Sequence, residues 1–150
     1  MFIRKMILVG VAAIVFLPMS LSATESETTK SSAWDQIDPA WAKVSNKIID
    51  FVGEDKQKLL ADLAYAAVAG DMCQSLKLDK KKFQAEFDEK LGNVDPKSMT
   101  AAELTQYGQK VSMYFGVYVG MLTSIGMLER ESFCNAAEQA KSAGEGRFWL

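Results

Sequence analysis

The strongest constraint on the fold is that both cysteines of this 150-residue chain follow an N-terminal export signal. The signal consists of Arg4 and Lys5, an apolar run over 6–17, the helix breaker Pro18 and small residues up to Ala23. This order is typical of a secretory signal peptide, and the apolar run is too short for a permanent membrane anchor. We therefore expect a cleaved signal peptide over 1–23 and a mature protein in the periplasm or outside the cell.

Cys73 and Cys134 are the only cysteines, and both remain after signal cleavage. An even number of cysteines in an oxidising compartment indicates a disulfide bond. Their near neighbours in sequence are acidic or apolar, which does not favour the reactive thiolate of a redox site. The pair predicts a structural disulfide between the second and fifth predicted helices.

Composition excludes several function classes. The chain contains no histidine, which removes Ser-His-Asp and Cys-His catalysis, Cys/His zinc sites and haem ligation by histidine. It has no CxxC pair and no glycine-rich phosphate loop. Its net charge of −2 argues against nucleic acid, whose binding depends on lysine and arginine. We expect no cofactor, no metal site and no enzymatic activity.

The remaining chain divides into a flexible polar leader over 24–33 and a single helical domain over 34–150. Apolar residues at helical spacing predict helices over 38–53, 54–73, 80–91, 100–128 and 130–142. Asp38 and Pro39 are a typical helix start, and Thr100 with Glu103 forms a capping box. The expected fold is all-α, a small orthogonal bundle of about five helices with one disulfide.

The predicted helix over 100–128 carries a small residue at every fourth position. These residues are Gly108, Ser112, Gly116, Gly120 and Ser124. Residues four apart lie along one side of a helix, so we interpret them as a helix-packing ridge. The expected partner is the alanine-rich side of the second helix, over 61–69. Gly116→Leu or Gly120→Leu would then overpack this seam at a cost of about 1–3 kcal/mol.

A membrane span over 111–128 is the alternative interpretation of the same segment. The segment is uncharged, and small residues four apart are frequent in membrane helices. It is short for a span, which needs about 20 residues, and it contains several polar side chains. A span would also separate Cys134 from Cys73. These observations favour a buried helix of a soluble bundle.

The apolar C-terminus has two interpretations. Phe148, Trp149 and Leu150 could fold back onto the bundle, as terminal aromatic residues often do. They could instead form a docking tail that a PDZ-type groove captures. Folding back is the favoured interpretation.

Clustered acids leave a carboxylate-based hydrolase open as a further alternative, because glycosidases use a pair of carboxyl groups. The candidates are Glu86, Asp88, Glu89, Glu129 and Glu131. Such residues on helices with nearby lysines and arginines more often form a solvated face.

The sequence therefore predicts an exported small helical protein that acts by protein–protein contact. A stress-protective chaperone and an inhibitor or immunity-type binder both fit this description. The alternatives are an inner-membrane-associated protein with one span at 111–128 and a histidine-free hydrolase. The expected partner is another protein. We expect no binding to nucleic acid, and no membrane association after the signal peptide has been cleaved.

Overall fold

The computed structural model describes residues 32–92 and 99–150. The predicted signal peptide and nearly all of the predicted leader lie outside the described residues. The elements are α1 (Ala33–Val52), α2 (Glu54–Met72), α3 (Lys80–Glu86), the π-helical turn η1 (Phe87–Leu91), α4 (Ala101–Leu128) and α5 (Arg130–Ser142). The predicted all-α bundle with one disulfide is confirmed.

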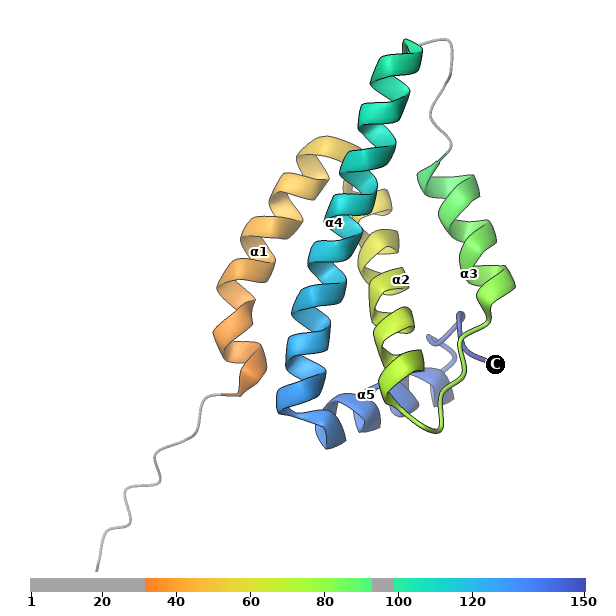
Figure 1. The fold of residues 1–150 in the computed structure, drawn as a ribbon. Helices are drawn as coiled ribbons and strands as arrows, with labels where there is room; N and C mark the ends of the chain where they lie inside the picture. Colours follow the sequence, from red (N-terminus) through yellow and green to blue (C-terminus); the bar gives the residue numbers. More distant parts are fainter. Residues whose placement is uncertain (1–31, 93–98) are drawn as a thin grey trace, which may run out of the picture.

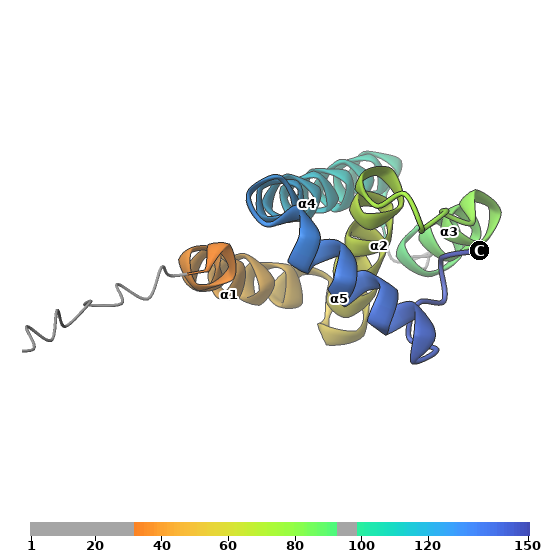
Figure 2. The same ribbon diagram turned by 90° about the horizontal axis from the view of Figure 1, so that it is seen from below.

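α2 is the central helix of the bundle. It packs against α1, α4, α5 and η1, and α4 is its most extensive neighbour (Figure 1). Seen from below, α1 and α4 flank α2 while α5 crosses the ends of α2 and α4 (Figure 2). The buried side chains of α2 are Leu59, Leu60, Leu63, Ala64, Ala66, Val68 and Ala69. The alanines among them allow neighbouring helices to approach closely.

Four of the predicted helices have nearly the expected boundaries because local chemistry determines their ends. The Thr100 side chain accepts a hydrogen bond from the Glu103 backbone N–H, and Glu103 accepts one in return from the Thr100 N–H, at 3.3 and 2.7 Å. The Asp79 carboxylate caps α3 by accepting from the Lys82 N–H at 3.1 Å. Each cap satisfies backbone donors that the first helical turn leaves without partners.

The predicted start of the first helix at Asp38 is wrong. α1 begins at Ala33, where Ser32 and Asp35 form a reciprocal capping box, and Pro39 lies inside the helix. Proline costs an internal helix one hydrogen bond, so the added turn needs support from elsewhere. The Ala33 N–H donates to the side chain of Glu129, at the junction of α4 and α5. The Ser32–Asp35 box is thus a local start signal that competes with Asp38-Pro39, and the Glu129 contact across the bundle supports the added turn.

The predicted disulfide joins Cys73, the residue that ends α2, to Cys134 in α5. Their α-carbons are 5.5 Å apart, within the range that a disulfide requires. Cys73 is buried, so the bond links the end of the central helix to the helix that crosses it.

Candidate functional site

The helix-packing ridge does not pack against any other helix in the part of the chain that the structure describes. Every one of its members is exposed: Gly108, Ser112, Gly116, Gly120 and Ser124. A β-carbon added at any of its three glycines would meet nothing within 4 Å. The prediction that this ridge forms the central packing seam is therefore wrong, although α4 does pack against α2 as expected.

The opposite side of α4 faces the bundle because it carries the larger side chains. Its buried side chains are those of Tyr107, Val111, Tyr118, Leu122 and Ile125. Burial stabilises in proportion to the apolar area removed from water, at roughly 25 cal/mol per Å², and glycine contributes almost none. The large residues therefore fill the space beside α2, which leaves the small ones outside.

The exposed side of α4 has a regular pattern of its own. Spacings of four and three residues alternate along it, which keeps the side chains on one face of a helix as in coiled coils. The exposed residues in this register are Gln106, Lys110, Met113, Val117, Gly120, Ser124 and Met127. We call the five from Met113 to Met127 the outer seam.

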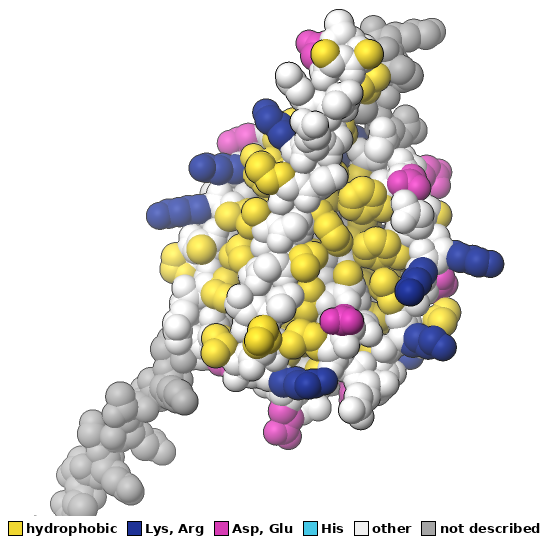
Figure 3. Space-filling view, in the orientation of Figure 1, with side chains coloured by type: hydrophobic (Ala, Val, Ile, Leu, Met, Phe, Trp, Pro, Cys, Tyr) yellow, Lys and Arg dark blue, Asp and Glu magenta, His cyan; other side chains and the backbone are white. Residues whose placement is uncertain are grey.

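The outer seam is apolar and accessible. Met113 is 54% exposed, Val117 37% and Met127 74%. No charged residue occurs between Val111 and Leu128. Figure 3 shows the uncharged surface along α4, with charged side chains around its margin. A groove of about 450 Å³ between α2 and α4 also borders the seam at Met127.

α4 is long and apolar enough to cross a membrane, judged by length and composition. A core helix of similar composition would be mostly buried, yet only 28% of the most apolar window of α4 is buried. One side of this helix therefore remains available for contact.

The buried side of α4 also carries a polar network. The Tyr118 hydroxyl accepts a hydrogen bond from the Gln57 side-chain amide at 2.6 Å and shares another with the Ser45 hydroxyl at 2.9 Å. The ring of Trp41 lies 4.6 Å from the Tyr118 ring, centroid to centroid. Tyr118 is fully buried, so these bonds satisfy a hydroxyl that water does not reach.

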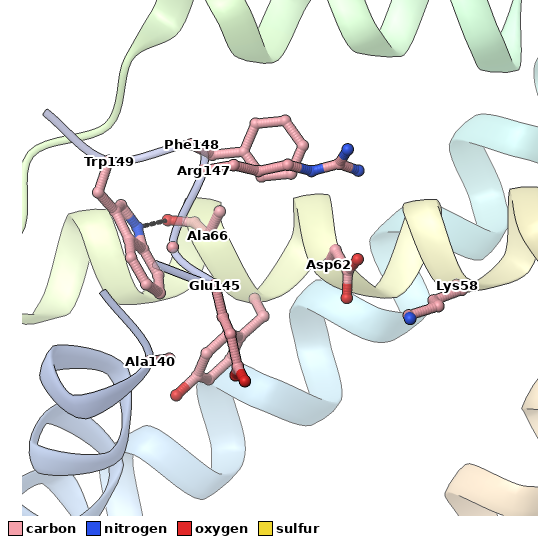
Figure 4. Close-up of a pocket in the computed structure, with 10 residues that line it drawn as sticks. Lys58, Asp62, Ala66, Ala140, Glu145, Arg147, Phe148 and Trp149 are labelled. Carbon is pink, nitrogen blue, oxygen red and sulfur yellow. Dashed lines mark hydrogen bonds between the residues drawn. The ribbon is translucent and has the colours of Figure 1, made fainter. Parts of the chain in front are cut away.

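A second candidate site is a cleft of about 390 Å³ between α2 and the C-terminal tail (Figure 4). Its charged lining residues are Lys58, Asp62, Glu145 and Arg147, and Tyr65 forms part of its wall. Burial raises the pKa of Asp62, and the charges of Lys58 and Arg147 oppose that rise. Burial also raises the pKa of Tyr65. The cleft thus contains both signs of charge beside aromatic surface.

The C-terminal tail folds back onto the bundle, as the favoured interpretation predicted. The Asp79 N–H donates to the Phe148 carbonyl at 2.8 Å, and the Leu150 N–H donates to the Lys77 carbonyl at 2.8 Å. Phe148 is buried, and the Trp149 indole donates to a carbonyl of α2 at 3.0 Å. A docking tail requires a free strand, whereas Phe148, Trp149 and Leu150 are hydrogen-bonded to the bundle in this structure.

Three of the carboxylates singled out in the sequence make structural contacts, and none of the five lines this cleft. Glu86 pairs with Lys90 at 3.1 Å, Asp88 accepts from Gln84 at 2.9 Å, and Glu129 caps α1. The cleft acids, Asp62 and Glu145, were missed because no sequence spacing relates α2 to the tail. Within 32–92 and 99–150, no group of three or more acidic or cysteine residues is arranged to hold a metal ion.

The described part of the chain thus offers two surfaces for contact, the outer seam of α4 and the cleft beside the tail. No protein-family model, no curated protein and no solved structure matches the chain.

Proposed function

We propose that this chain is an exported helical protein that acts by direct contact with another protein, and that the outer seam of α4 is its binding surface. The observation that carries the proposal is the row of exposed apolar side chains on a helix whose other side is already packed. Exposed apolar patches bordered by polar residues often mark interaction sites. Burial of Met113, Val117 and Met127 against a partner would supply the binding energy.

The geometry of the seam suits a helical partner. Apolar anchors three and four residues apart are how one helix recognises another. Methionines at both ends add flexible, polarizable side chains that adapt to a partner surface. Because the apolar side chains are exposed without any trigger, a constitutive protein contact fits better than an acid-activated chaperone.

The single-span alternative is supported less well. If α4 crossed a membrane, lipid would surround the helix and separate the Tyr118 hydroxyl from its hydrogen-bond partners Ser45 and Gln57. The hydroxyl would then be buried in lipid without a partner. The Cys73–Cys134 bond also ties the regions before and after α4 to each other. A hydrolase has weaker support too, because two of the expected catalytic acids have structural contacts: Glu129 caps α1 and Glu86 pairs with Lys90.

Site-specific photo-crosslinking in the native cells tests this proposal. A photoreactive residue in place of Val117 should form an adduct with one protein of defined mass. The same photoreactive residue in place of the exposed Lys81 on α3 should form no such adduct. Adding Met113→Asp to the variant with the photoreactive residue at position 117 should abolish its adduct. Adducts with lipid alone, or equal labelling at both positions, would refute the proposed function.

A further inference from the structure

We propose that the protein that occupies the outer seam is a second copy of this chain, in an antiparallel α4–α4 pair. The inference rests on the proposed function and names its partner. Alternating spacings of four and three predict that two such faces pack at a crossing angle of about 20°. The pair is symmetric about a two-fold axis near residues 118 and 119.

Side-chain size makes the seam complementary to itself. In antiparallel coiled-coil register, Val117 lies opposite the partner's Gly120, and Met113 lies opposite the partner's Ser124. Each of these layers joins a large side chain to a small one. The space at Gly120 is open in the single chain, so Val117 of a second copy can enter it. A parallel pair would instead place Val117 opposite Val117 and Gly120 opposite Gly120. The valine layer would then be crowded and the glycine layer would contain an empty space.

Charge selects the same orientation. Lys110 precedes the uncharged stretch, and Glu129, Arg130 and Glu131 follow it with a net charge of −1, so the two ends of the seam differ in sign. In antiparallel register each Lys110 lies opposite the partner's Met127, beside the junction of α4 and α5 that carries the partner's Glu131, whereas a parallel pair opposes Lys110 with Lys110. Lys110 lies at the edge of the seam with its ammonium 5.1 Å from the Phe51 ring, and remains exposed there. The antiparallel arrangement also aligns the two helix dipoles favourably.

Sedimentation equilibrium of the exported full chain, without detergent and from about 1 to 100 µM, measures the association. The mass should rise from monomer to dimer across this range. Gly120→Leu should weaken the dimer at least about tenfold, because its side chain meets the partner's Val117. The matched control is Gly108→Leu, since Gly108 is equally open but lies outside the seam register. It should leave the dimer unchanged.

Carbodiimide coupling of native residues tests the orientation. Lys110 lies 18 residues before Leu128, the last residue of α4, which is roughly 27 Å along that helix, and Glu131 lies beyond it in α5. A zero-length bond between Lys110 and Glu131 must therefore join two copies. A mixture of unlabelled and ¹⁵N-labelled protein should yield a mixed Lys110–Glu131 crosslink. Lys110→Glu and Glu131→Lys should each weaken the dimer, and the double reversal should restore it.

The outcomes separate this inference from the proposed function. A monomer at every concentration, or a dimer equally insensitive to Gly120→Leu and Gly108→Leu, overturns the antiparallel pair. If that monomer forms a Val117 adduct with a different protein in cells, the proposed function still stands. The protein could instead float with vesicles of phosphatidylethanolamine and phosphatidylglycerol while forming no dimer in solution and no protein adduct in cells. That result would overturn both the antiparallel pair and the proposed function.

Discussion

The hydroxyl group of Tyr118, in the middle of α4, accepts a hydrogen bond from the side-chain amide of Gln57 in α2 at 2.6 Å. The same hydroxyl reaches Ser45 in α1 at 2.9 Å, so one buried oxygen links three helices. These bonds orient the buried face of α4, and the outer seam faces away from the bundle as a result.

Tyr118→Phe should lower the free energy of unfolding by about 1 kcal/mol, because it removes both hydrogen bonds and leaves the ring in place. Urea denaturation of the two proteins measures the difference. Tyr114→Phe is the matched control, since Tyr114 lies on the same helix as Tyr118 and its half-buried ring packs against Phe51 of α1. Equal effects of the two substitutions would show that the network adds nothing to stability.

Removal of the Cys73–Cys134 bond should destabilise the fold by about 4 kcal/mol, because the bond closes a long loop in the unfolded chain. Urea denaturation with and without reductant tests this for the natural protein. The Cys73→Ser, Cys134→Ser double variant should match the reduced protein and show no response to reductant. Identical midpoints for oxidised and reduced protein would contradict the prediction.

The capping box at the start of α4 should make stability depend on acid pH. Two hydrogen bonds from Thr100 hold the pKa of Glu103 below its usual value of 4.5. The larger effect comes from the Thr100 backbone N–H and the smaller one from its side chain. A carboxyl whose pKa is lower in the folded state stabilises the fold above its unfolded-state pKa. This contribution disappears as the pH falls through the folded-state pKa.

Glu103→Gln should therefore flatten the stability profile between about pH 5 and pH 3. Thermal unfolding across that range measures the profile. The control is Glu89→Gln, which changes an exposed carboxylate outside the cap and should keep the slope of the natural protein. A Glu103→Gln profile as steep as that of the natural protein would show that this cap does not contribute.

Local signals explain why much of the fold could be predicted. Asp79, and Thr100 with Glu103, satisfy backbone donors within one turn of themselves, so α3 and α4 begin where the sequence indicates. The predicted start of α1 was wrong because Asp38-Pro39 resembles a helix start, whereas the helix begins at the Ser32–Asp35 capping box. The added turn is also supported by Glu129, which is 96 residues from Ala33 and accepts a hydrogen bond from its N–H. Asp62 and Glu145 likewise form one cleft only after the tail folds back onto α2.

The sequence by itself determined the helical class, most helix ends and the Cys73–Cys134 bond, because caps act within one turn and two cysteines allow one pairing. The tertiary structure decided which side of α4 is buried. A helix that is apolar on all sides has no polar face to specify its rotation. Its rotation depends on which side chains fill the space beside α2, where Tyr118 and Leu122 pack, and so the five small residues of the ridge lie outside.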